Sequence, residues 1–303
     1  MKKTFLISDD FINARLDRWF KSIVSYVPQS LIEKNIRKGN IKVNNRKKRS
    51  SYRLQKEDIV SIHNINFSSN KHKEKTTKYV ATKKDLSSSS GIFIEDNENF
   101  VIVNKPAGLA VQSGTKSRKN ILDILSSRKE FQDMYPYPVH RIDKETTGIL
   151  IVAKTRKYAQ LFTSLFRLRK IHKTYLVVVL GEFQKSKGTL KDELFYYEGD
   201  KKIKAVAITH YTVLDSNNNY SLLELNPVTG RKHQLRKQLL IHGNPVLGDD
   251  KYRLSENYYK KKNTLMLHAY KINFSIAGKK YKYTAEPPIE FKKVLKEKYL
   301  KSF

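Results

Sequence analysis

The chain contains no cysteine among its 303 residues, and only one tryptophan and three methionines. Without cysteine it can form neither disulfides nor thiolate zinc sites, which excludes disulfide-stabilised secreted domains and zinc-cysteine modules. No apolar stretch approaches the roughly 18 residues that a membrane-spanning helix needs. Asp9 and Asp10 interrupt the N-terminal segment before it could serve as a signal peptide. We therefore expect a cytoplasmic protein that does not span a membrane.

Acidic side chains are also scarce, because 29 Asp and Glu stand against 60 Lys and Arg and give a formal net charge of +31. A surplus this large favours a polyanionic partner, with nucleic acid ahead of an anionic membrane surface. The surplus is densest in residues 1–90, which hold 21 basic and 8 acidic side chains. The abundance of Lys, Asn and Ile is equally compatible with drift in an AT-rich genome, so charge alone does not establish binding.

Residues 11–63 have the pattern of a small domain of two helices and short strands. Apolar side chains at helical spacing predict a first helix over 16–23. Ser30 and Glu33 have the spacing of a capping box, which predicts that a second helix begins there. Gly39 is a natural C-cap, at which we expect this helix to end.

Basic side chains recur along that second helix and into the hairpin after it, which predicts one basic surface rather than a merely solvated face. We expect this surface to consist of Lys34, Arg37, Lys38 and Lys42, followed by the basic run 46–49, and to bind the polyanionic partner.

The composition divides the chain into three parts. Residues 68–90 are rich in Ser, Thr and Lys, which is typical of a linker. They separate a first domain over residues 1–67 from a second over residues 91–303. From Gly91 onward, apolar strand patterns alternate with helical ones, which indicates the α+β class.

The segment 140–154, HRIDKETTGILIVAK, holds the strongest candidate for a reactive group. Asp143 lies among basic residues, and the unbroken apolar run 149–153 that follows predicts a buried strand. A loop braced by a buried strand can hold a carboxylate in a fixed geometry. Taken locally, Asp143 could equally be an ordinary turn residue.

Two further segments could meet Asp143 in one cleft. Tyr175 begins the predicted strand 175–180, although it could be an ordinary strand aromatic. A helix is expected from about Arg231 to Ile241, and its start would offer free N–H groups and cations to an anion. Arg231 and Arg236 are both candidates to pair with Asp143 and keep it ionised.

Metal and nucleotide chemistry have little support in the sequence. Six ligand-type side chains occur near these segments, but no pair has a known metal spacing. The chain has neither a Gly-x-Gly-x-x-Gly fingerprint nor a phosphate-cradling Gly-Lys-Ser/Thr loop. We expect no metal and no cofactor. The six side chains are His140, Asp143, His172, His233, His242 and His268.

The motif at 140–148 resembles the catalytic HRLDxxTSG motif of the RluA-type pseudouridine synthases. Residues 15–44 resemble an S4 RNA-binding domain, so that the first domain is expected to be a small S4-like α/β unit. Four further segments are similar to family motifs and follow in the family's order: 104–108 (KPxG), 173–175 (KxY), 229–236 (TGRxHQxR) and 265–269 (LxLHA).

The resemblance implies a pseudouridine synthase fold, with a mixed, mainly antiparallel central sheet flanked by helices and loops. It also implies an isomerase that flips a uridine out of RNA and converts it to pseudouridine. Asp143 would be the nucleophile, acting directly or by a glycal route. Tyr175 would stack on the base and help remove its C5 proton, and Arg236, or else Arg231, would pair with Asp143. The remaining substrate-binding residues would be His140, Arg141, Arg231, His233, Gln234 and Leu267, with Arg141 filling the vacated place in the RNA stack.

The layout with an S4-like domain resembles the members that modify large-subunit (23S) ribosomal RNA. The implied partner is that RNA or its precursor, bound by a monomer, and not DNA or a membrane. A tRNA substrate and a non-catalytic RNA-binding factor on an inactive scaffold are the alternatives. The chain departs from the family pattern mildly at Ile142 and Thr147, which keeps the hydroxyl, and also at Asn244. The departures at Lys232, Lys237 and Gln238 could alter RNA contacts.

Overall fold

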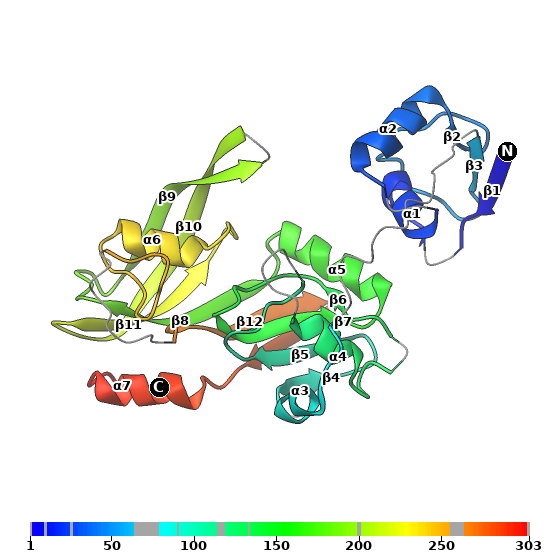
Figure 1. The fold of residues 1–303 in the computed structure, drawn as a ribbon. Helices are drawn as coiled ribbons and strands as arrows, with labels where there is room; N and C mark the ends of the chain where they lie inside the picture. Colours follow the sequence, from blue (N-terminus) through cyan, green and yellow to red (C-terminus); the bar gives the residue numbers. More distant parts are fainter. Residues whose placement is uncertain are drawn as a thin grey trace. The chain divides into compact units, whose positions relative to one another are not determined.

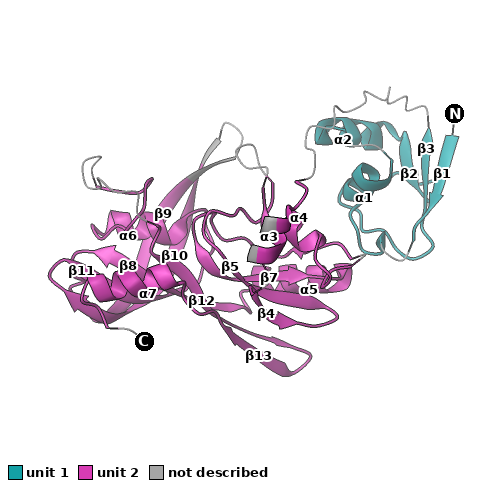
Figure 2. Cartoon of the chain, turned by 60° about the horizontal axis from the view of Figure 1, so that its bottom comes forward, with its two compact units in different colours: residues 1–77 teal, residues 78–303 magenta. Residues whose placement is uncertain are grey.

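The computed structural model describes residues 2–8, 11–24, 27–63, 79–89, 91–113, 119–132, 134–198, 201–254 and 264–301. The chain divides into two compact units, residues 1–77 and 78–303 (Figure 2). The predicted domain boundary at residue 67 and the first part of the predicted linker, 68–78, lie outside the described residues.

Unit 1 packs two helices against a three-stranded antiparallel sheet of order β1-β3-β2. Side chains of both helices, among them Trp19, Phe20 and Ile32, are buried in its core. The predicted helix over 16–23 is confirmed. The elements are β1 (Lys2–Leu6), α1 (Leu16–Ile23), α2 (Gln29–Lys38), β2 (Ile41–Val43) and β3 (Ile59–His63). The likeness of this unit to an S4 domain stays a prediction.

Helix α2 ends as predicted and begins otherwise. Gly39 is its C-cap in the left-handed conformation, with φ 79°. The predicted capping box at Ser30 is wrong, because the helix already begins at Gln29 behind Pro28. The Gln29 side-chain amide donates a hydrogen bond to the Glu33 carboxylate (3.2 Å). A capping box would instead have used this carboxylate to accept from the helix start.

Part of the predicted linker is a helix of unit 2. Residues 83–88 form α3 (Lys83–Ser88), whose N-cap Thr82 makes a capping box with Asp85. Asp85 also accepts from the Tyr79 hydroxyl and pairs with Lys119. The polar residues that suggested a linker thus pack onto unit 2. Their side chains make the hydrogen bonds at the start of α3 instead of facing water.

Unit 2 is built on a ten-stranded sheet in which β7 and β12 form the parallel pair and the other pairs are antiparallel (Figure 1). The predicted α+β fold with a mixed, mainly antiparallel sheet is confirmed. The strand order is β4-β5-β7-β12-β8-β11-β10-β9, with β6 beside β7 and β13 beside β12. The strands are β4 (Phe93–Asp96), β5 (Phe100–Lys105), β6 (Tyr137–Pro138), β7 (Thr147–Ala153), β8 (His172–Leu180), β9 (Lys187–Glu198), β10 (Lys201–Asn217), β11 (Tyr220–Pro227), β12 (Leu267–Ile276) and β13 (Lys279–Thr284).

Strand β7 is buried over its whole length, as the apolar run predicted. Alternate side chains enter two different cores, with Ile149 and Ile151 in one and Leu150 and Val152 in the other. Helix α5 (Arg156–Arg167) covers the first core and α4 (Ile121–Ser126) the second. Both faces of β7 therefore exclude water, which is why its sequence does not alternate between apolar and polar residues.

Two further helices complete unit 2. Helix α6 (Gln234–Ile241) packs near the β9–β10 hairpin, and α7 (Ile289–Glu297) buries Phe291 and Leu295 in a core with β8 (Figure 1). Within the described ranges, no helix is long and apolar enough to cross a membrane.

Gly148 is the position at which this sheet tolerates no side chain. Its φ is +104°, and a Cβ would lie 2.2 Å from the carbonyl oxygen of Ala269 in β12. Gly148→Ala is therefore expected to destabilise the protein by about 3 kcal/mol or more, measured by urea unfolding. Gly91→Ala is the control, because nothing lies within 4 Å of its Cβ position. Equal stability of the two variants would contradict the prediction.

Candidate active site

Asp143 lies in the loop that leads into β7. Its carboxyl group is partly exposed, with 25% of the side chain accessible, and its backbone oxygen accepts a turn hydrogen bond from Thr146 (3.2 Å). Asp143 is thus in a turn, as the local sequence suggested, but its side chain remains free to meet other groups.

Helix α6 supplies the cationic partner of Asp143. Arg236 Nη1 donates to Asp143 Oδ2 at 3.2 Å, and His233 Nε2 lies 3.7 Å from Asp143 Oδ1. Arg231 Nε instead donates to the backbone oxygen of Val206 at 3.2 Å. Of the two predicted alternatives, the structure brings Arg236 to Asp143.

Helix α6 starts later than predicted, and this explains why Arg236 rather than Arg231 pairs with Asp143. Helix α6 begins at Gln234, and His233 before it has a left-handed backbone with φ 52°. Arg231 therefore lies in a turn before the helix, whereas Arg236 is in its first turn. The expected helix start at about Arg231 is therefore three residues too early, and the anion site at the helix start stays a prediction.

Tyr175 of β8 is held between neighbouring strands, opposite Ala269 of β12 and Leu225 of β11. Burial and the negative charge of Asp143 raise the pKa of the Tyr175 phenol. The raised pKa keeps the phenol neutral at physiological pH.

Two residues predicted to bind substrate belong to the scaffold. Gln234 is 4% exposed and uses its whole hydrogen-bonding capacity within the protein. Its oxygen accepts from the Thr229 hydroxyl and the Arg231 N–H, and its NH₂ donates to Ile208 O and the Thr209 hydroxyl. Leu267 is 3% exposed in an apolar core. Neither side chain can contact RNA, because the fold already surrounds it.

His140 braces the Asp143 loop against β7. Its Nε2 accepts a hydrogen bond from the Ile151 N–H (2.8 Å), and its ring lies on Phe166 with centroids 4.7 Å apart. Burial, helped by the charge of Lys173, lowers the pKa of His140 to about 3, so the ring is neutral. Its substrate contact stays a prediction, as does that of the exposed Arg141.

His268, in the LxLHA segment, links β7 to β12. Because its Nε2 lies 2.9 Å from the Ala285 carbonyl oxygen, that nitrogen must donate, and Nδ1 then accepts from the Thr147 hydroxyl at 2.8 Å. Burial lowers the pKa of His268 to about 4. Thr147 therefore supplies the hydroxyl that a serine of the family motif would offer.

The buried neutral His268 should make stability depend on pH. In the unfolded chain its pKa is about 6.5, so that form binds the proton first as the pH falls. Stability is fully present above about pH 6.5 and is expected to fall by about 3 kcal/mol as the pH approaches 4. Urea unfolding from pH 7.5 to 4.5 should show a shallower decline for His268→Asn than for the wild type. Identical slopes would contradict this role.

Lys105 at the end of β5 is a buried residue whose role the sequence did not reveal. It is 0% exposed, and its Nζ donates to the backbone oxygens of Pro106 and Leu109 (2.9 Å each) and Lys144 (3.0 Å). Burial lowers the pKa of Lys105 to about 7, while the charges of Glu145 and Asp143 act in the opposite direction. The bond to the backbone oxygen of Lys144 holds the residue that follows Asp143. The available signal was the KPxG motif at 104–108.

Some of the basic side chains predicted in unit 1 line a hollow of about 450 Å³. Arg37 of α2 lines it together with Lys47, Lys48 and Arg49 of the following loop. Lys34 and Lys38 are exposed on the same helix, and Lys42 of β2 is partly exposed. Their contact with RNA stays a prediction.

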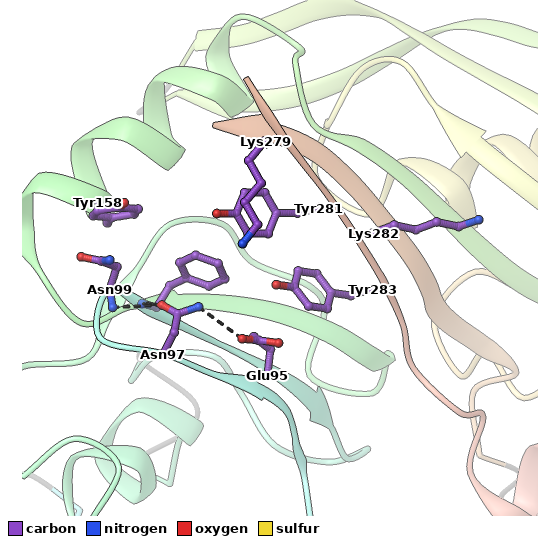
Figure 3. Close-up of a pocket in the computed structure, with 9 residues that line it drawn as sticks. Glu95, Asn97, Asn99, Tyr158, Lys279, Tyr281, Lys282 and Tyr283 are labelled. Atoms are coloured by element: carbon purple, nitrogen blue, oxygen red, sulfur yellow. Dashed lines mark hydrogen bonds between the residues drawn. The ribbon is translucent and has the colours of Figure 1, made fainter. Parts of the chain in front are cut away.

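Another hollow, of about 400 Å³, lies away from Asp143. Figure 3 shows Tyr158, Tyr281 and Tyr283 around it, with Glu95 and Lys279. Phe100 also lines this hollow. It is the first residue of β5, whereas Lys105 is the last. Lys279 already lies over the Tyr281 ring, 5.2 Å from its centroid. Because none of the predicted site residues lines this hollow, the residues around Asp143 are the candidate active site.

Among the described residues, no three Asp, Glu or His side chains cluster as metal ligands would.

Comparison with known proteins agrees with this geometry. The family model described as RNA pseudouridylate synthase matches residues 99–240, which include Asp143, Tyr175 and Arg236. A ribosomal large subunit pseudouridine synthase C of Rickettsia conorii is 34% identical over 92% of this chain and 96% of its own length. The chain belongs to the RNA pseudouridylate synthase family. The predicted family and enzyme class, an isomerase acting on RNA uridines, are confirmed.

Other RNA pseudouridylate synthases extend the similarity. A second relative of the same description, from Rickettsia bellii, is 33% identical over 93% of this chain and 97% of its own length. The solved structure of human RNA pseudouridylate synthase domain containing 4 matches with a TM-score of 0.62 and 26% identity. It covers 72% of this chain and 96% of that chain. The fold therefore agrees with the sequence similarity.

Proposed function

We propose that this RNA pseudouridylate synthase isomerises specific uridines of large-subunit (23S) ribosomal RNA. The relatives named as ribosomal large subunit enzymes support this substrate. The observation that carries the chemistry is the pairing of Asp143 with Arg236 beside Tyr175. It brings a carboxylate and its arginine partner to the strand that carries an aromatic ring on which a base can stack.

Asp143 acts as the nucleophile on the ribose C1′, or promotes a glycal route. The glycosidic bond from C1′ to N1 breaks, on the nucleophilic route as the Asp143 carboxylate bonds to C1′, and the base rotates. A new bond then forms from C1′ to C5, and the bond from C1′ to Asp143 breaks to restore the carboxylate. The C5 proton then leaves, and N1 gains a proton. The hydrogen bond from Arg236 Nη1 orients the Asp143 carboxylate for attack. The raised pKa of Tyr175 keeps its phenol protonated in the free enzyme, so little phenolate is present to accept the C5 proton, and stacking on the base is the role that the structure supports.

The uridine must leave the RNA helix for this reaction, at a cost of a few kcal/mol. Arg141 is exposed two residues before Asp143, and its planar cation can stack in the vacated position. Phosphate contacts come from the basic side chains around the hollow of unit 1. We further propose that the enzyme is a cytoplasmic monomer that binds RNA and not DNA.

Pseudouridine mapping in a deletion strain tests the substrate. We expect specific sites in 23S ribosomal RNA to lose pseudouridine and to regain it when the wild-type chain is restored. Restoration with Asp143→Asn is the matched control and should leave the sites as uridine. Loss confined to tRNA would overturn the ribosomal assignment. An unchanged map in both RNAs would overturn catalysis in favour of RNA binding alone.

A further inference from the structure

Arg236 is held from the side opposite Asp143 by a second carboxylate. The side chain of Asp249 is 0% exposed. Its Oδ2 accepts from Arg236 Nε and its Oδ1 from Arg236 Nη2, both at 2.6 Å. Oδ1 also accepts from the backbone N–H groups of Lys251 and Tyr252 at 2.9 Å each. Four donors therefore fix the Asp249 carboxylate in the turn before residue 253.

This grip determines how Arg236 meets Asp143. A guanidinium group is planar, so two bonds to one carboxylate set both its position and its orientation. The nitrogen left over is Nη1, which donates to Asp143 Oδ2 at 3.2 Å. Burial would lower the pKa of Arg236, but Asp249 and Asp143 together raise it, so the group remains a cation between two carboxylates.

Tyr252, in the same turn, orients the second neighbour of Asp143. Its ring covers the guanidinium, with the Arg236 Cζ 5.0 Å from the ring centroid. Its hydroxyl lies 2.8 Å from His233 Nδ1, and His233 Nε2 lies 3.7 Å from Asp143 Oδ1. The turn that Asp249 organises thus fixes both side chains that approach Asp143, Arg236 of α6 and His233 at its N-cap.

We propose that Asp249 is a positioning residue for the isomerisation, acting on Asp143 through Arg236 and, by way of Tyr252, through His233. The inference rests on the proposed role of Asp143. In the described structure Asp249 bonds to Arg236 and to the backbone of its own turn, and not to Asp143. Its effect on Asp143 must therefore pass through Arg236, Tyr252 and His233. A salt bridge that served stability alone would not affect the rate of the chemical step.

Asp249→Asn tests the proposal, because asparagine keeps the shape but can accept from only one side of the guanidinium. Single-turnover tritium release from C5-labelled uridine RNA should slow about 100-fold, since a misplacement near 1 Å has effects of that order. The dissociation constant for RNA should change less than about threefold. The control is Asp250→Asn, at the exposed neighbouring position, with an unchanged rate.

A double-mutant cycle with Arg236→Ala separates positioning from general damage. Because only the path through Tyr252 and His233 remains in Arg236→Ala, adding Asp249→Asn should slow the reaction less than about tenfold more, well short of its effect in the wild type. Multiplicative losses, or a wild-type rate in Asp249→Asn, would overturn the proposal. Should Asp249→Asn fail to fold, Asp249→Glu keeps the charge but shifts the guanidinium by one methylene. Its rate should also fall at least tenfold, and a wild-type rate would again overturn the proposal.

The two hypotheses fail in different ways. If the wild-type chain releases no tritium from any ribosomal RNA fragment, the proposed function is wrong. If the wild-type chain is active and the Asp249 variants match it, only the positioning role is wrong.

Discussion

Asp143→Asn is expected to reduce tritium release from C5-labelled uridine RNA by about 10⁴-fold or more. Removing a nucleophile has effects of this size because the step that it opens has no alternative route. Asparagine has the same shape, and its carbonyl oxygen can still accept from Arg236 Nη1, which now lies 3.2 Å from the carboxylate. The variant should therefore fold and bind RNA while losing the reaction.

The same loop provides the control for this prediction. Glu145 is an exposed acid two residues further on, and Glu145→Gln removes the same charge without touching the nucleophile. Its rate should remain within about threefold of the wild type. Normal release by Asp143→Asn, with the protein pure and folded, would show that another group attacks the ribose.

Lys105→Met is expected to have the largest effect on stability, with a loss of about 3–5 kcal/mol. Methionine has a similar length but no donor, so it leaves three backbone oxygens without the ammonium that they share. One of these oxygens belongs to Lys144, next to Asp143, so the loop should also lose its geometry. We expect both a lower urea midpoint and a rate reduced at least tenfold under conditions where the variant is folded.

Lys144→Met distinguishes the buried lysine from lysines in general. Lys144 is exposed, and only its backbone oxygen takes part in the Lys105 bonds. This control should retain the wild-type stability within about 0.5 kcal/mol. If Lys105→Met unfolds at the same urea concentration as the control, the three bonds do not contribute the expected stability.

The features predicted correctly depend on residues close together in the chain. The buried strand β7 follows from an apolar run, and the end of α2 follows from a glycine that accepts a left-handed backbone. Helix α5 begins after Thr155 through an equally local contact, in which the threonine hydroxyl accepts from the Tyr158 N–H. In each case the local pattern has one favourable conformation.

The predictions that failed involve side chains whose partners are distant in the chain. Glu33 is occupied by Gln29, so the capping box does not form. Gln234 is saturated by groups from β10 and from the turn before α6, so it cannot read RNA. The polar residues 79–89 pack on α4 and its neighbours instead of forming a free linker. The polarity of a residue shows that it needs partners but not which partners the fold supplies.

The sequence by itself determined the positive charge, the order of the motifs and the candidacy of Asp143, because these depend on residue type and spacing alone. Only the tertiary structure decided that Arg236, 93 residues away, pairs with Asp143. It also decided that Lys105 is buried among backbone oxygens and that Asp249 holds Arg236 from behind. These contacts require the sheet to bring β5, β7 and the start of α6 together. That assembly is driven by burial of apolar residues spread along the whole chain.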